Sequence, residues 1–242
     1  MNPVQGIAFD VPPEWEPKST GWVRYVARNG DPEDKPLIAM RAPAYLDERW
    51  CRSDNDRDGS LEDTPLATVG TKTNTAAGSP RQVASLDPQT WVVGQYAQPD
   101  RSKVRPGPVE DFTTRSGLTG SLGSAWSDGA GSAKKCTSDG KAWTFAFRDP
   151  RGDVESVSFV GAMNVPDEVA DTTVRKIMGT VRRYQEPSYR TETPWPTSLG
   201  HTHFVTYAKV CNDVHQMDST DATIPPPRRL SSHSAVTHSK HP

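Results

Sequence analysis

The segment KAWTFAFR, residues 141–148, decides the fold, because bulky aromatic and small side chains alternate along it. A period of two is typical of a β-strand that presents one bulky face. Val154–Gly161 alternates in the same way, and Asp149–Asp153 between the two segments combines proline with glycine, as hairpin turns do. The two segments therefore predict neighbouring antiparallel strands.

Further strands are expected on both sides of this pair. Val104–Thr114 and the glycine-broken Gly117–Trp126 extend it into a meander that runs from Phe112 to Ala162. Asp47–Thr64 is polar and predicts a loop. Shorter alternating segments predict strands at Gly6–Val11, Trp22–Arg28, Leu37–Ala42 and Leu66–Thr73.

A first helix is predicted to begin at Ser79. Ser79 is a favoured N-cap residue, Pro80 suits the first helical position, and Gln82 can complete a capping box. Pro88 is expected to break or kink this helix after its first turn, because proline removes a backbone hydrogen bond. The helix is expected to bury Val83, Leu86 and Trp91.

A second helix is predicted between Pro166 and Arg183. Its first residues are acidic and its last are basic, which suits the helix dipole. We expect its apolar face to cover the meander. That face consists of Val169, Thr173, Val174, Ile177, Met178 and Val181.

These patterns predict an α+β domain at residues 1–184, in which two helices pack on an antiparallel sheet of about six to eight strands. Residues 185–242 lack sustained periodicity, contain Pro225-Pro226-Pro227 and hold all six histidines of the chain. We interpret 185–242 as a disordered tail, and as a candidate for a non-native extension.

Composition limits the partners. The net charge is −2 with acidic and basic residues mixed, so no basic field favours a nucleic acid. No apolar segment approaches the roughly 18 residues of a membrane span, and no signal peptide is evident. If Met1 is the true start, a soluble cytoplasmic protein is expected, whereas membrane association requires an anchor upstream.

Cysteine is sparse. Cys51 and Cys136 lie in the predicted domain and Cys211 lies in the tail. The spacing of Cys51 and Cys136 fixes no geometry, so the pair is either a disulfide or two buried free thiols.

An acidic segment resembles a calcium-binding loop. Asp54, Asp56, Asp58 and Glu62 occupy loop positions 1, 3, 5 and 9, with a glycine at position 6. Position 12, where a bidentate glutamate closes the coordination shell, is Pro65. A solvated acidic loop is the alternative, and no other cofactor is expected.

A zinc site is suggested by four residues of the tail, but their spacing matches no common zinc site. They are His201, His203, Cys211 and His215.

Ser132-x-x-Lys135 and Ser138-x-x-Lys141 fit a Ser/Lys hydrolase, in which the serine opens a helix so that the lysine can take its proton. Ser132 and Ser138 fall in a predicted Gly/Ser loop, so the hydrolase is the weaker alternative and no catalytic residue is assigned.

Several segments, taken in order, resemble the actinobacterial extracytoplasmic domain of unknown function, which often follows a membrane anchor and a Pro/Gly/Ser-rich linker. They are Gly6–Pro12 with Trp15, Trp50–Ser53, the helix opened by Ser79, Phe112-x-Thr114-x-x-Gly117-Leu118-x-Gly120, Cys136, and Val165–Arg183.

The resemblance covers about residues 4–184 and implies a PsbP-like architecture. It also implies a Cys51–Cys136 disulfide and a location outside the cytoplasm, and it implies no catalytic residue. We therefore expect a non-catalytic domain that binds a protein, a cell-envelope component or a small ligand.

Overall fold

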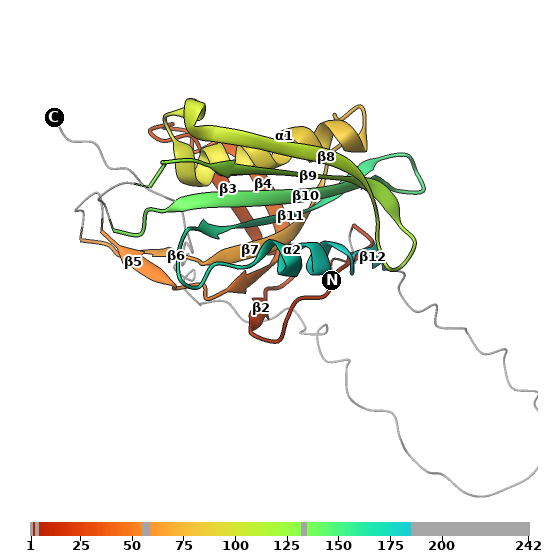
Figure 1. Ribbon diagram of the computed structural model, residues 1–242, viewed down its shortest axis with the longest axis horizontal. Helices are drawn as coiled ribbons and strands as arrows, with labels where there is room; N and C mark the ends of the chain where they lie inside the picture. Colours follow the sequence, from red (N-terminus) through yellow and green to blue (C-terminus); the bar gives the residue numbers. More distant parts are fainter. Residues whose placement is uncertain (1, 3–4, 55–58, 132–134, 185–242) are drawn as a thin grey trace, which may run out of the picture. The chain divides into compact units, whose positions relative to one another are not determined.

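The computed structural model describes residues 2, 5–54, 59–131 and 135–184 (Figure 1). The predicted tail at 185–242, with its zinc pattern, lies outside these residues. Within the described part of the chain, no helix has both the length and the apolar character that crossing a bilayer requires.

One antiparallel sheet of eight strands confirms the predicted α+β class (Figure 1). In spatial order its strands are β2 (Trp15–Pro17), β4 (Pro36–Leu46), β7 (Ala67–Thr73), β11 (Val154–Met163), β10 (Asp139–Arg148), β9 (Thr119–Ser127) and β8 (Val104–Thr113), and β3 (Val23–Ala27) pairs with β4.

The predicted hairpin of β10 and β11 forms, and its register places Trp143 opposite Phe159. The turn is held by Asp149, whose carboxylate accepts the backbone N–H groups of Arg151 at 2.8 Å and Asp153 at 2.9 Å. An aspartate that bonds to the backbone of its own turn stabilises that turn locally. The hairpin can therefore be traced from local sequence alone.

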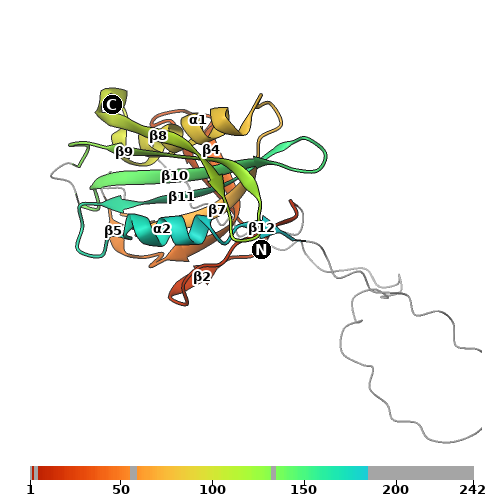
Figure 2. The same ribbon diagram turned by 45° about the vertical axis from the view of Figure 1, so that its right-hand side comes forward.

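The two helices cover opposite faces of the sheet (Figure 2). Phe145 and Phe147 of β10 belong to the core beneath α2 (Asp171–Met178), whereas Ala146, between them, packs with Val83 of α1 (Pro80–Val92). Successive side chains of a strand point to opposite faces, so the alternation in residues 141–148 separates a bulky layer from a small-residue layer.

Helix α1 begins as predicted. The Ser79 hydroxyl accepts the backbone N–H of Gln82 at 3.2 Å. Gln82 reaches back as expected, but its Oε1 accepts the N–H of Gly78 at 3.0 Å and not that of Ser79. These bonds satisfy N–H groups that no helical carbonyl can reach.

Of the two predicted effects of Pro88, a break and a kink, the break does not occur, because the helix continues through Pro88 to Val92. Proline leaves the carbonyl of Ala84, four residues earlier, without its usual helical donor. A Cβ placed on Gly123 of β9 would lie 2.0 Å from that carbonyl oxygen. The helix therefore packs closely on a glycine of the sheet at the turn where proline removes a hydrogen bond.

Helix α2 is shorter than predicted. It begins at Asp171 and ends at Met178, while Arg182–Arg183 forms strand β12, which pairs with β1 (Ile7–Ala8). Before the helix, the Glu168 carboxylate accepts the N–H of Asn164, so these residues form a turn. Strand β1 is likewise shorter than the predicted Gly6–Val11.

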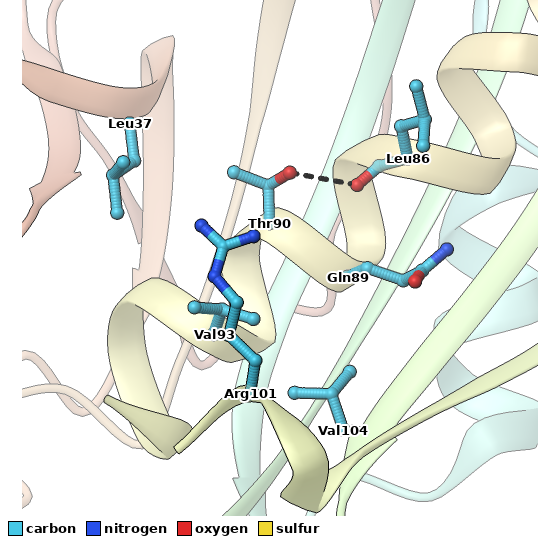
Figure 3. Close-up of a pocket in the computed structure, with 7 residues that line it drawn as sticks. All are labelled: Leu37, Leu86, Gln89, Thr90, Val93, Arg101 and Val104. Atoms are coloured by element: carbon cyan, nitrogen blue, oxygen red, sulfur yellow. Dashed lines mark hydrogen bonds between the residues drawn. The ribbon is translucent and has the colours of Figure 1, made fainter. Parts of the chain in front are cut away.

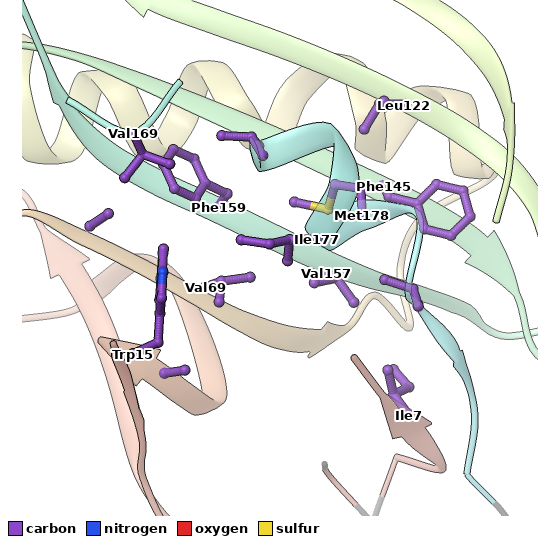
Figure 4. Close-up of a cluster of buried hydrophobic side chains, with 14 of the residues drawn as sticks. Ile7, Trp15, Val69, Leu122, Phe145, Val157, Phe159, Val169, Ile177 and Met178 are labelled. Atoms are coloured by element: carbon purple, nitrogen blue, oxygen red, sulfur yellow. The ribbon is translucent and has the colours of Figure 1, made fainter. Parts of the chain in front are cut away.

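The apolar face of the second helix covers the sheet as predicted (Figure 4). It packs against Phe145, Phe159 and Val69, which come from three neighbouring strands. Of the residues predicted for this face, Val174, Ile177 and Met178 are buried in α2, and Val169 and Val181 are buried just before and after it.

The predicted loop at Asp47–Thr64 contains a two-stranded hairpin of β5 (Cys51–Ser53) and β6 (Glu62–Thr64). Arg52 Nε and Asp63 Oδ1 lie 2.7 Å apart across the pair. Polar cross-strand pairs such as this one stabilise a hairpin without producing an apolar alternation. Hydrophobic periodicity therefore could not reveal it.

Candidate functional site

A hollow of about 250 Å³ lies on the outer flank of α1, between the first residues of β4 and β8 (Figure 3). We call it the first hollow. Apolar and polar side chains from five elements line it. They are Leu37, Leu86, Gln89, Thr90, Val93, Arg101 and Val104.

Helix α1 supplies one wall through side chains three and four residues apart, which share a helix face. Leu86 is 51% exposed, so the prediction that it is buried is wrong. Since α1 directs Val83 and Trp91 into the core, its period of 3.6 residues turns Leu86 outward.

Local hydrogen bonds fix the polar groups of this wall. Thr90 Oγ1 donates to the carbonyl of Leu86 at 2.9 Å, and Gln89 Nε2 donates to the carbonyl of Ser85 at 2.7 Å (Figure 3). The Thr90 hydroxyl hydrogen is thus used within the helix, which leaves the hydroxyl oxygen as an acceptor.

Arg101 brings a positive charge to the first hollow from the short 3₁₀ turn η2 (Arg101–Lys103). Asp100 beside it is engaged elsewhere, because its carboxylate accepts the hydroxyl and the N–H of Ser102 at 2.6 and 3.0 Å. These bonds hold the pKa of Asp100 below its usual range. Arg101 makes no ion pair or side-chain hydrogen bond with any described residue.

A second hollow, of about 360 Å³, lies on the other side of Leu86. Lys72 Nζ and Asp87 Oδ2 pair there at 2.9 Å. Burial raises the pKa of Asp87, and Lys72 opposes the shift. The second hollow is lined by Lys72, Thr73, Asn74, Thr75, Ala76, Ala77, Gln82, Val83, Leu86 and Asp87.

Glu155 is a buried acid on the opposite face of the sheet. Only 1% of the residue is exposed, and the Thr73 hydroxyl donates to its carboxylate, whose oxygens lie 3.0 and 3.1 Å away. Gln5 Nε2 donates to the same hydroxyl at 2.7 Å. Burial raises the pKa of Glu155 to about 7. The sequence held a signal for this acid, because Glu155 alternates in phase with Val157 and Phe159.

The predicted calcium ligands are only partly described. Asp56 and Asp58 lie outside the described residues, whereas Glu62 begins β6 and Asp54 follows β5. Asp54 Oδ2 accepts the N–H of Gly59 at 3.2 Å, and Asp54 Oδ1 is buried without a hydrogen-bond partner. Among the described residues, no three His, Cys, Asp or Glu side chains are grouped for a metal ion.

Cys51 and Cys136 form a disulfide in the structure, with their Cα atoms 5.5 Å apart. The bond joins β5 to the segment that precedes β10, across a sequence separation of 85 residues. It thereby ties the polar hairpin of β5 and β6 to the main sheet.

Of the two Ser–Lys patterns, only Ser138 with Lys141 lies fully within the described residues. Ser132 lies outside the described residues, and Ser138 immediately precedes β10. Lys141 Nζ lies 2.5 Å from Glu168 Oε1 and 2.7 Å from Asp171 Oδ1. The lysine therefore joins the start of α2 to the sheet through ion pairs.

Sequence reasoning did not find the first hollow. Leu37 and Arg101 are far apart in the chain, and neither belongs to a recognisable motif. Only the packing of α1 between the starts of β4 and β8 brings them to one place.

The fold and the two hollows define an α+β domain with recessed surface along one helix. Residues 1–186 match the family model described as a domain of unknown function, DUF8017. Because the match spans more than half of the chain, the chain belongs to this family. None of the curated proteins compared with the chain is significantly similar to it.

Proposed function

We propose that the chain is a non-catalytic, extracytoplasmic domain of an actinobacterial cell envelope, with PsbP-like architecture, that binds its ligand along α1. One observation carries the proposal: the first hollow combines apolar side chains with one guanidinium. Its lining residues are leucine, valine, glutamine, threonine and arginine, none of which titrates near neutral pH. Such a surface is suited to recognition and offers no acid–base pair.

The disulfide supports a location outside the cytoplasm. Disulfides persist in oxidising compartments and are rare where thiols are kept reduced. An anchor upstream of this chain would hold the domain at the membrane, where its partner is a protein or another envelope component. The near-balanced charge argues against a nucleic acid partner.

A thermal-shift measurement on the full chain tests the binding function. The panel contains aliphatic carboxylates, peptidoglycan fragments, soluble lipid headgroups and short peptides. A ligand at about a hundred times its Kd stabilises the folded state by about 2.7 kcal/mol, which raises the Tm of a protein of this size by roughly 5–10 °C. If no member of the panel raises the Tm, the binding function is wrong. Chemical conversion of a member would contradict the non-catalytic character of the domain.

Thiol trapping in cells tests the location. Free thiols are alkylated before lysis, and the redox state of Cys51 and Cys136 is then determined by mass spectrometry. An oxidised pair in the extracytoplasmic fraction is expected. Two alkylated cysteines in the cytoplasmic fraction would contradict the proposed location.

Calcium binding is a second candidate, favoured by the buried and unpartnered Oδ1 of Asp54. A carboxylate oxygen is a ligand that calcium prefers, and burial without a partner is unfavourable for a charged group. Calcium at millimolar concentration should then raise the Tm of the wild type and not that of Asp54→Asn. An unchanged Tm of the wild type would exclude this function.

A further inference from the structure

The two hollows meet at Leu86, which lines both of them. The exposed stripe of α1 continues on either side of it, through Gln82 in the second hollow and Gln89 in the first. We call this surface the α1 groove: the two hollows with Leu86 between them. An exposed leucine between two recesses provides a contact for an extended apolar group.

The first hollow forms one end of the α1 groove and contains the positive charge of Arg101. Arg101 points into the first hollow beside Val93 and Val104 (Figure 3). Its guanidinium has no anionic partner among the described residues. An unpaired guanidinium next to apolar walls favours an anion, and its planar fork matches a carboxylate or a phosphate oxygen pair.

The size of the first hollow limits what it can hold. A cavity of 150 Å³ accommodates benzene, so the roughly 250 Å³ here suit about ten non-hydrogen atoms. An eight-carbon carboxylate has that number. A longer chain would pass over Leu86 into the second hollow.

We propose that the α1 groove binds a small amphiphile whose single anionic group pairs with Arg101 and whose unbranched aliphatic chain lies along Val93, Val104 and Leu86. The inference rests on the proposed binding function and names its ligand class. The anionic group can belong to a free fatty carboxylate or to an alkyl phosphate, which share this chemistry.

Titration calorimetry on the full chain tests the proposal with octanoate, octyl phosphate, octanol and acetate. Affinity should rise about fourfold for each added methylene that becomes buried, until the first hollow is filled. Arg101→Gln should weaken octanoate about tenfold or more, because a charge-assisted hydrogen bond is lost. The same variant should leave octanol unchanged. The affinities of octanoate and octyl phosphate, compared with each other, then show whether the groove prefers a carboxylate or a phosphate.

Arg81→Gln is the matched control, because Arg81 is an exposed arginine of α1 that lines neither hollow. It should bind octanoate like the wild type. Leu86→Asp should weaken octanoate and octanol together, since it puts a charged carboxylate in the path of the aliphatic chain that both ligands share. The melting temperature of each variant verifies that it is folded.

Three results would overturn the ligand class. The wild type could bind neither octanoate nor octyl phosphate, or Arg101→Gln and Arg81→Gln could lose the same octanoate affinity. The third result is an octanoate affinity that Leu86→Asp leaves unchanged. If another member of the thermal-shift panel still stabilises the chain, the binding function stands without this ligand class. If none does, both fail.

Discussion

Neutralising Glu155 should make the protein more stable at neutral pH. Its pKa is raised from 4.5 in the unfolded reference to about 7 in the folded state, primarily by burial. The Thr73 hydroxyl, Arg151 and Arg183 lower it, and the charge of Asp149 raises it. The folded state therefore holds the proton of Glu155 more tightly than the unfolded chain does.

The sign of the effect follows from linkage. Below pH 4.5 the carboxyl is protonated in both states, and its neutral form is accommodated in the core. As the pH rises towards 7, the unfolded chain ionises first and becomes more favourable, so stability is lost. A difference of about 2.5 pKa units at 1.36 kcal/mol each sets the loss at about 3 kcal/mol at most.

The assay is chemical denaturation of the full chain at several values between pH 5 and 8. The other titrating groups are common to both proteins, so the difference between wild type and Glu155→Gln isolates the contribution of this one carboxyl. The variant keeps the shape of the side chain, and its free energy of unfolding should exceed that of the wild type by an amount that grows as the pH rises. Glu33→Gln, on an exposed glutamate paired with Lys35, is the control and should follow the wild type.

A wild-type stability that rises from pH 5 to 8 would refute the reasoning. So would a Glu155→Gln variant that shows the same fall as the wild type. Either result would mean that Glu155 ionises as readily in the folded state as in the unfolded chain.

Three more stability changes should be measurable by denaturant titration. Replacing Cys51 and Cys136 with serine should cost about 4 kcal/mol, because the bond closes a loop of 85 residues; a chain that loses nothing would show that the bond is not formed in solution. Gly123→Ala should destabilise by about 1–3 kcal/mol, since its Cβ would meet a carbonyl of α1 at 2.0 Å, whereas Gly21→Ala has open space around it and should be nearly neutral. Ile177→Ala removes a side chain that is 2% exposed and should cost about 2–5 kcal/mol; a smaller loss would place the residue outside the core.

The elements that were predicted correctly are those with a strong local signal. The β10–β11 hairpin has both alternation and turn chemistry, and the apolar face at Val169–Val181 has the helical period. The buried acid Glu155 could also have been found, since it shares a strand face with two apolar residues.

The errors arise where tertiary contacts outweigh local preference. Nothing near Pro88 in the sequence shows that α1 packs closely on Gly123 of another strand. The β5–β6 hairpin depends on a polar pair and on a disulfide to Cys136, so it has no apolar pattern. The first hollow combines residues from β4, α1 and β8 that no spacing rule connects.

The two layers of the domain also explain why the candidate site lies along α1 and not along α2. Helix α2 presents large apolar residues to the aromatic layer of the sheet. Helix α1 faces the small layer, where Ala146 and Gly123 let it approach the strands closely. The two recesses beside the outer face of α1 are lined in part by the first residues of β4 and β8 and by the last residues of β7. Leu86 thereby stays exposed between two recesses, as a consequence of the alternation that sets the fold.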